Sequence, residues 1–386
     1  MPEGIACTIL GPNVEGAQAV GTCTKEFSGV ANVVLTAVGL EGWPFAGWDV
    51  PGCGTGVSCA VPLDAPQVVR VRFGYVFPLT VAGVPGRQGA GTITSRPTGI
   101  TCIVTAGGLF GFCSSSWPQG TIIQLTAVPE PGSRLAAWSS PCTGYSCSVM
   151  VDGETLVHAA FDLVYALRFD SGQLQFAEIA DSPSLDLSSE WTIEAWIWQE
   201  TINSNLHIIS KWGTAPEASY VLEANMGYLR LATNDGVNAS TVLEENTVAM
   251  PTHTWTHIAA SYSAGVARLY INGIEVAQGA MSQPANSSQP LSFGREGPPL
   301  NSRYFDGRLD EVRIWSVARS QSQIAGAMNA VLSAPAAGLV GYWRLDEATG
   351  QVLHDLSGAG NDGLLGGGLS TAMSDPTWIS STAPVE

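Results

Sequence analysis

The position of the cysteines limits what this chain can fold into. All eight lie within the first 147 residues, and the remainder of the 386-residue chain has none. They are Cys7, Cys23, Cys53, Cys59, Cys102, Cys113, Cys142 and Cys147. The chain therefore joins at least two kinds of module. Its 44 glycines and 23 prolines, together with 45% hydrophobic residues, are typical of a turn-rich all-β protein.

The cysteine-bearing half is an internal repeat. Residues 2–7 (PEGIAC) match residues 97–102 (PTGITC), and Leu-Thr-Ala-Val at 35–38 recurs at 125–128. We predict repeats at residues 1–74 and 75–163 and a different module at 164–386. The second copy opens with a strand–turn–strand pattern at 78–95 for which the first copy has no room. We therefore expect the chain to be part of a longer repeat array, with the first copy truncated.

Within each copy the cysteines form two close pairs. These are Cys7 with Cys23, Cys53 with Cys59, Cys102 with Cys113, and Cys142 with Cys147. Recurrence of the close pairs favours local disulfides and an oxidising compartment. A zinc site is the alternative, but about thirty Gly- and Ser-rich residues separate the pairs and no histidine accompanies them.

These motifs resemble the divergent InlB B-repeat of bacterial surface proteins. The resemblance rests on Pro-x-Gly-Ile-x-Cys, Leu-Thr-Ala-Val, Ala-x-Trp, the paired cysteines and a closing phenylalanine, over residues 1 to about 163. It implies small β modules that act as stalks or spacers in exported proteins. Trp48 and Trp138 recur at one position, which favours core packing over ligand contact.

The cysteine-free half shows short alternating strands, such as 191–198 (WTIEAWIW) and 267–271 (ARLYI). Asn272-Gly273 predicts a tight hairpin turn, and one short helix is expected at about 320–332. A dozen strands in some 220 residues predict a two-sheet jelly-roll sandwich.

Seven motifs in this half resemble the LamG-like jelly roll of the concanavalin A-like lectin/glucanase superfamily. They include 191–196 (WTIEAW), 269–273 (LYING), 307–315 (GRLDEVRIW) and 341–347 (GYWRLDE). The resemblance implies a β-sandwich that binds glycans or proteins and often holds structural Ca²⁺.

The residues argue against catalysis. Glucanases of this superfamily carry Glu-x-Asp-x-Glu on one strand face, whereas 192–196 offers Glu194 alone. Asp346 and Glu347 are adjacent, so on a strand they point to opposite faces. His253 and His257 are about 13 Å apart along a strand, too far for a shared zinc ion. We predict that the chain is not an enzyme.

Calcium is predicted at Asp310 and Asp170. Asp310 has the same strand parity as Val312 and Ile314, which directs a carboxylate toward an apolar side, where it needs a partner or a metal. The resemblance implies a Ca²⁺ ligand at this position, with a second contribution near Asp170. Pairing with an arginine such as Arg168 is the alternative, and the loop 355–362 is a less favoured second site.

A ligand-binding face is predicted from the parity of residues 191–198. If Ile193, Ala195 and Ile197 face the core, alternate residues face outward. The candidate ligand-binding residues are Glu194, Trp196 and Trp198, joined by Tyr228 and Arg230. Aromatic rings beside acids suit sugar recognition, although Trp196 belongs to the general strand motif and packing under a loop is its alternative role.

The net charge of the chain limits the kinds of partner that it can bind. The net charge is −17, of which residues 164–386 contribute −13, and the chain has only Lys25 and Lys211 as lysines, so no nucleic acid is expected. No apolar run approaches the roughly 18 residues of a membrane span, so no membrane insertion is expected.

We predict an extracellular or bacterial cell-surface recognition module that binds carbohydrate. A structural or adhesive module that contacts a cell-surface protein is the alternative, and a glycoside hydrolase is less favoured.

Overall fold

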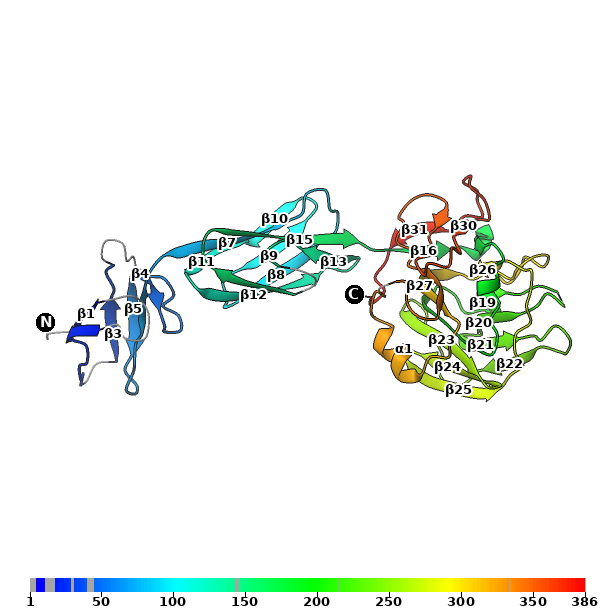
Figure 1. The fold of residues 1–386 in the computed structure, drawn as a ribbon, viewed down its shortest axis with the longest axis horizontal. Coiled ribbons are helices and arrows are strands. Elements are labelled where there is room, and N and C mark those ends of the chain that lie inside the picture. Colours follow the sequence, from blue (N-terminus) through cyan, green and yellow to red (C-terminus); the bar gives the residue numbers. More distant parts are fainter. Residues whose placement is uncertain are drawn as a thin grey trace. The chain divides into compact units, whose positions relative to one another are not determined.

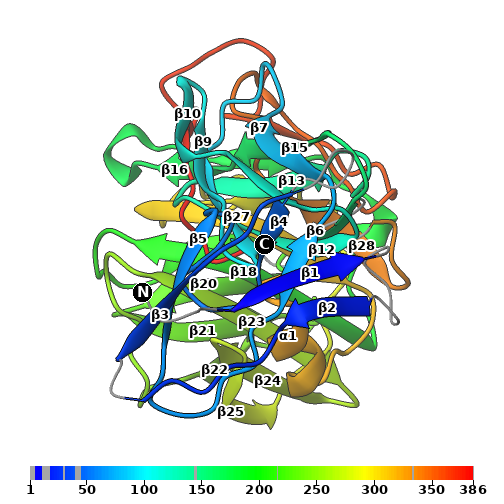
Figure 2. The same ribbon diagram turned by 90° about the vertical axis from the view of Figure 1, so that its left-hand side faces the viewer.

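A computed structural model describes residues 5–10, 18–28, 31–39, 45–142, 146–214, 216–332 and 334–385. The chain divides into two compact units, Met1–Glu130 with Arg134–Asp162, and Pro131–Ser133 with Leu163–Glu386. Figures 1 and 2 show both as β structures. The expected opening motif at 2–4 lies outside the described residues.

The strands that the structure describes in the first repeat form three two-stranded antiparallel sheets. These pair β1 (Ala6–Leu10) with β2 (Gln18–Thr22), β3 (Asn32–Thr36) with β5 (Ser58–Pro62), and β4 (Phe45–Trp48) with β6 (Val71–Phe73).

The second repeat is a two-sheet module. One sheet has the order β10 (Gly108–Phe112), β9 (Thr101–Thr105), β8 (Gly91–Arg96), β12 (Thr121–Pro129), β14 (Cys147–Val151). The other has the order β11 (Ser114–Pro118), β7 (Val76–Gly83), β15 (Thr155–Leu163), β13 (Ser133–Trp138). Their alternating apolar residues form one core, which includes Leu79, Ile93, Phe161 and Trp138. Trp138 is thus a core residue, as its recurrence predicted.

All eight cysteines form the predicted local disulfides. Cys7 is bonded to Cys23, Cys53 to Cys59, Cys102 to Cys113, and Cys142 to Cys147. In the second repeat Cys102, Cys142 and Cys147 are part of the hydrophobic core. The bonds reinforce modules whose small cores supply little stability by themselves.

The second unit is the predicted jelly roll, built from two eight-stranded sheets. Sheet A has the order β25 (Ile274–Ala280), β24 (Val266–Ile271), β23 (Trp255–Ser263), β18 (Glu190–Gln199), β27 (Gly307–Trp315), β16 (Tyr165–Phe169), β31 (Thr377–Ser380), and β28 (Leu339–Trp343) also pairs with β27. Sheet B has the order β22 (Thr241–Glu244), β21 (Tyr228–Thr233), β20 (Tyr220–Asn225), β19 (Leu206–Lys211), β26 (Leu291–Phe293), β17 (Ala177–Ile179), β30 (Gly363–Leu365), β29 (Val352–Leu353).

The core of the jelly roll lies between the inner faces of the two sheets. Ile193, Ala195 and Ile197 of sheet A and Leu229 and Leu231 of sheet B are fully buried in one cluster. Period-two alternation places these residues on the inner faces, so their neighbours in sequence point away from the core. The outer faces of the two sheets are therefore distinct surfaces on opposite sides of the sandwich.

Local signals in the sequence produce the turns and the helix. Asn272 and Gly273 both have positive φ, as the predicted tight hairpin requires. Helix α1 (Gln321–Ala327) begins at Ser320, whose side chain forms a capping box with Gln323. The helix ends earlier than the sequence pattern indicates, and both ribbon views show it beside β23 and β24 of sheet A. Among the described residues no helix has the length and apolar character needed to cross a bilayer.

Candidate functional site

Glu194 lies on the outer face of sheet A but is fully buried. Its Oε1 atom accepts hydrogen bonds from Arg319 Nη1 at 2.7 Å and from Trp315 Nε1 at 2.9 Å. His257 Nε2 lies 3.7 Å from Glu194 Oε2. Burial, with the charges of Arg313 and Arg319, lowers the pKa of His257 to about 3. The imidazole is therefore neutral at physiological pH, and the predicted ligand residue Glu194 is instead enclosed.

Trp196 is also buried, because the end of α1 lies on it. Its Nε1 atom donates to the carbonyl of Met328 at 2.8 Å, just after the helix ends at Ala327. Arg313 donates to the carbonyls of Ala327 and Ala330 at 2.9 and 2.7 Å. These donors satisfy carbonyls that the end of a helix leaves unpaired. Packing, the alternative role for Trp196, is what the structure shows.

Trp198 is half-buried at the end of the same face. The guanidinium carbon of Arg308 lies 4.5 Å from the centre of its ring, and Arg308 is itself bonded to Glu200 at 3.1 Å. Trp255 packs edge-on against Trp198, with 6.0 Å between ring centres. A stacked cation and a second indole thus occupy the surroundings of this ring.

The parity argument for Asp310 is wrong, because β27 contains a bulge. The pairing register between β18 and β27 shifts between Glu194 and Trp196, and Glu311 has φ of +51°. Leu309 and Val312 therefore both face the core although they are three residues apart. Asp310 points outward, where its carboxylate accepts a hydrogen bond from the hydroxyl of Ser381.

The structure does not bring the side chains of Asp310 and Asp170 together. In the antiparallel pairing of β16 with β27, Leu167 lies opposite Leu309 and Phe169 opposite Gly307. Asp310 lies one residue beyond the first pair, and Asp170 lies one residue beyond the second pair at the other end. The two aspartates are therefore four positions apart along the strands, about 13 Å. The Asp170 side chain instead caps a 3₁₀ turn by accepting from the amide of Gly172 at 2.8 Å. No group of three or more metal-ligating side chains is found in the part of the chain that the structure describes. Calcium binding elsewhere stays a prediction of the resemblance.

The loop at 355–362 is a hydrogen-bonded turn. Asp355 accepts from the amides of Tyr342, Ser357 and Asn361 at 2.9–3.0 Å. Its carboxylate is thus used to hold its own loop against β28.

Substituting Asp310 with Asn tests its role directly. Burial, followed by the negative charge of Glu311, raises the pKa of Asp310 well above its usual value. The folded state then binds this proton more tightly than the unfolded state, so the contribution of Asp310 to stability is present at low pH and is lost as pH rises through the raised pKa. Asp310→Asn is expected to be at least as stable as wild type at pH 7.5, and its advantage should shrink toward pH 4.5.

Urea unfolding at the two pH values measures this difference. Asp170→Asn is the control, since asparagine caps such turns about as well as aspartate and little change in stability is expected. A Ca²⁺-dependent stabilisation of wild type that is absent in Asp310→Asn would contradict the prediction and restore the calcium site at Asp310.

Tyr228 and Arg230 lie on the other sheet, so the expectation that they join Glu194, Trp196 and Trp198 is wrong. They belong to β21 of sheet B, where the intervening Leu229 faces the core. Both side chains therefore point from the outer face of sheet B. The alternation of residues along a strand predicts which side chains face the core, but it does not predict which of the two sheets the strand joins.

The outer face of sheet B carries a row of charged and polar side chains across four strands, which we call the charged row. It consists of His207, Glu223, Arg230 and Glu244. The pairing register places His207 opposite Glu223, Glu223 opposite Arg230, and Arg230 opposite Glu244. Directly opposite residues on one face lie about 5 Å apart, so these side chains interact as neighbours.

The inner end of the charged row is buried and tightly connected. His207 is fully buried and Glu223 is 1% exposed. His207 Nε2 lies 3.3 Å from Glu223 Oε2, and its Nδ1 atom lies 3.2 Å from the hydroxyl of Ser210. Arg303, from the loop that follows β26, reaches His207 Nε2 at 3.3 Å. These contacts fix the positions of the groups that support Arg230.

The outer end of the charged row reaches solvent. Arg230 Nε lies 3.2 Å from Glu223 Oε1, its Nη1 atom donates to Asn205 Oδ1, and 23% of its side chain is exposed. Tyr228 is half-buried and pairs with Asn225 at the end of the hairpin. Met226 and Gly227 form the tight turn, both with positive φ. An aromatic ring, a guanidinium and amide groups thus share one face.

Sequence reasoning found Tyr228 and Arg230 but missed the residues that surround them. These are His207, Glu223, Glu244, Asn205 and Arg303. Each is separated from the others by turns and loops of variable length, so only the strand register brings them together. The sequence contains one indication of this grouping. The alternation of β20, the strand before that of Arg230, predicts that Glu223 points outward.

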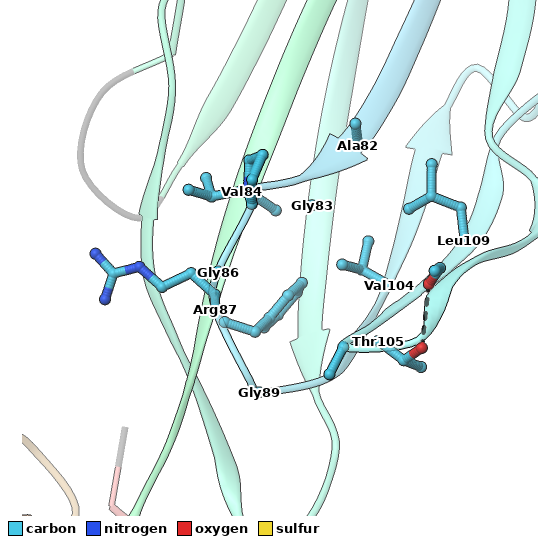
Figure 3. Close-up of a pocket in the computed structure, with 14 residues that line it drawn as sticks. Ala82, Gly83, Val84, Gly86, Arg87, Gly89, Val104, Thr105 and Leu109 are labelled. Atoms are coloured by element: carbon cyan, nitrogen blue, oxygen red, sulfur yellow. Dashed lines mark hydrogen bonds between the residues drawn. The ribbon is translucent and has the colours of Figure 1, made fainter.

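A shallow depression of about 190 Å³ lies in the second repeat. Figure 3 shows Val104 and Leu109 on one side of it and Val84 on the other, while the guanidinium of Arg87 points away. Arg87 is paired with Asp162 at 2.6 Å. The lining is mainly glycine and aliphatic, which offers few hydrogen-bonding groups to a sugar.

Comparison with known proteins agrees with the motifs. The family model of the concanavalin A-like lectin/glucanases superfamily matches residues 171–325, and that of the divergent InlB B-repeat domain matches residues 98–164. No curated protein matches the chain.

Three similar solved structures have low sequence identity. A putative carbohydrate binding protein from Bacteroides ovatus is 18% identical, with a TM-score of 0.47, covering 81% of this chain and 94% of that one. A SAP-like pentraxin from Limulus polyphemus is 13% identical, with a TM-score of 0.35, covering 42% and 80%. Domain 4 of an extracellular arabinanase from Geobacillus stearothermophilus, solved with arabinotriose, is 21% identical, with a TM-score of 0.30, covering 37% and 68%.

The matched motifs, the two-sheet core and these family models agree: residues 98–164 match the divergent InlB B-repeat domain, and residues 171–325 match the concanavalin A-like lectin/glucanases superfamily.

Proposed function

We propose that the jelly roll is a non-catalytic glycan-binding module and that the charged row is its binding site. The observation that carries the proposal is the position of Arg230. Its guanidinium is held by Glu223 and Asn205 yet remains partly exposed beside Tyr228. Sugar sites combine an aromatic surface with a few fixed polar groups that face the hydroxyls.

Fixed polar groups matter because ordering them costs binding energy. Glu223 is buried and lies 3.2 Å from Arg230 Nε, and Asn205 accepts a hydrogen bond from Arg230 Nη1, so the guanidinium is already held in place before a ligand binds. Preorganisation of this kind raises affinity by reducing the entropy lost on binding. Asn225 and Glu244, themselves hydrogen-bonded to each other at 2.5 Å, add acceptors and a donor at the rim of the row.

The same geometry favours binding over cleavage. Glu223 and Glu244 lie two strands apart, about 10 Å across the sheet. A hydrolase needs its two carboxylates on either side of a glycosidic bond. Here Arg230 lies on the strand between them, where that bond would have to be.

We further propose that the protein acts outside the cell, at a bacterial surface, with the repeats as a spacer. Four disulfides require an oxidising compartment. The match to a bacterial surface repeat supports the same location. The alternative partner, a cell-surface protein, is distinguished by the experiment below.

Substituting Tyr228 with Ala is expected to weaken glycan binding about fivefold, because loss of an aromatic contact costs on the order of 1 kcal/mol. Arg230→Lys should weaken it by a similar or larger factor, since lysine keeps the charge beside Glu223 but loses the fork of donors. A glycan array identifies the ligand, and isothermal titration calorimetry measures each variant.

Tyr75→Ala is the matched control, because Tyr75 is an exposed tyrosine of the second repeat. It should bind as wild type does. A folded protein that binds no glycan on the array, or equal affinities for all variants, would contradict the proposal and favour a protein-contacting adhesive role.

A further inference from the structure

Strand β10 of the second repeat is an exposed, apolar sheet edge. Among the described strands it is the outermost of the five-stranded sheet, and its one partner there is β9. Phe110 is 57% exposed and Phe112 is 76% exposed. Both lie on the outer face, opposite Ile103 and Thr101 of β9, and Ile103 is 40% exposed. Exposed aromatic residues on an edge strand invite pairing with another strand.

The usual protections against edge pairing are missing from this segment. Proteins commonly place lysine, proline or other charged residues on exposed edges. The sequence of β10 is GLFGF, and no charged residue occurs from Pro97 to Pro129. In a chain with a net charge of −17, this stretch is where two copies can approach without mutual repulsion.

The aromatic residues are specific to the second copy of the repeat. Strand β2 occupies the equivalent position in the first copy, at an offset of 90 residues. Gly21 there corresponds to Gly111, whereas Val20 and Thr22 correspond to Phe110 and Phe112. The glycine therefore belongs to the repeat, since a side chain at Gly111 would meet the carbonyl oxygen of Thr101 at 2.5 Å. The phenylalanines are not required by the repeat fold.

We propose that two copies of this chain associate through antiparallel pairing of β10 with β10, about a two-fold axis at Phe110. This register places Phe112 of each copy opposite Gly108 of the other, and Leu109 opposite Gly111. Large side chains thus cover the glycines of the partner strand, an arrangement known to stabilise edge glycines. The pattern is self-complementary, as a two-fold interface requires.

The side of β10 that faces the core of the repeat is also accessible to a second copy of the chain. Leu109 is 42% exposed and lines the depression of Figure 3 with Val104. Two five-residue edges form a small interface, so the dimer lies in the weak, micromolar class. This inference concerns the repeat and does not depend on glycan binding by the jelly roll.

Sedimentation velocity of the full chain, from about one to a few hundred micromolar, tests the proposal. Wild type should shift from monomer to dimer and no further. Phe110→Lys should raise the dissociation constant at least tenfold, because it places two charges face to face at the axis. Met150→Lys is the matched control, since Met150 is 57% exposed on β14, the opposite edge of the same sheet.

A wild type that stays monomeric, assemblies larger than a dimer, or equal losses in Phe110→Lys and Met150→Lys would each overturn the proposal. Circular dichroism confirms that the variants fold. As a second measurement, an exposed Phe110→Cys should form an intermolecular disulfide under mild oxidation, because paired strand residues bring their Cα atoms within about 5.5 Å. Failure to cross-link while Met150→Cys does so would also overturn it.

Discussion

Replacing Lys211 with Met is expected to lower the free energy of unfolding of the jelly roll by about 3–5 kcal/mol. Lys211 is fully buried at the end of β19. Its Nζ atom donates to Asp181 Oδ1 and Asp186 Oδ1, each at 2.7 Å, and to the carbonyl of Ser287. The ammonium has three donors, and all three are used. Methionine fills the same volume but leaves two carboxylates without their cation.

Urea unfolding followed by tryptophan fluorescence measures the loss. Lys25→Met is the matched control, because Lys25 is the one other lysine in the sequence and is exposed. It should change stability by less than about 0.5 kcal/mol. A stability of Lys211→Met within that same margin of wild type would contradict the prediction.

The contacts of Lys211 also bear on the expectation that calcium braces the jelly roll. Its ammonium ties β19 to the segment that contains Asp181 and Asp186 and to the loop at Ser287. Carboxylate and carbonyl oxygens are the ligands that calcium uses, and here they surround a side-chain cation. At this position the ammonium group of Lys211 makes the contacts that a bound cation would make.

Replacing Arg313 with Met is expected to destabilise the jelly roll by a similar amount, about 3–5 kcal/mol. Arg313 is 1% exposed, and its Nη2 atom donates to Glu311 Oε2 at 2.7 Å. It also donates to the carbonyls of Ala327 and Ala330. Its removal deprives a buried carboxylate of one cation and takes away the donors to the carbonyls of Ala327 and Ala330 at the end of α1.

Unfolding measures the total loss, and hydrogen exchange of the α1 amides measures the local one. Both should change in Arg313→Met. Arg268→Met is the control, since Arg268 lies on β24 of the same sheet and makes a partly exposed ion pair with Glu275. Unchanged exchange in α1 would show that Arg313 does not hold the helix on sheet A.

Several features of the fold could be read from the sequence because they depend on neighbouring residues. The close cysteine pairs gave the disulfides, since short loops favour local bonds. Asn272-Gly273 gave the hairpin turn, because its backbone conformation favours those residues. Period-two alternation identified Ile193, Ala195 and Ile197 as core residues. In each case the determining interaction lies within a few residues or within one strand.

The candidate site could be read only in part. Tyr228 and Arg230 were found by residue type, but the partners that hold Arg230 come from other strands and from the loop that follows β26. Glu194 and Trp196 were assigned to a ligand face because nothing in their own segment indicates that α1 covers it. The bulge at Glu311 reversed the direction of Asp310 through one extra residue.

The sequence by itself therefore determined the local disulfides, the tight turns and the inner and outer residues of most strands, and it contains the motifs that the two family models match. Only the tertiary structure decided which outer face is covered, which strand joins which sheet, and which charged residues meet. The physical reason is the distance along the chain between the residues that interact. Turn, disulfide and strand preferences arise from nearby atoms, whereas the charged row and the contacts of Lys211 arise from strand pairings and loop positions that join residues far apart in the chain.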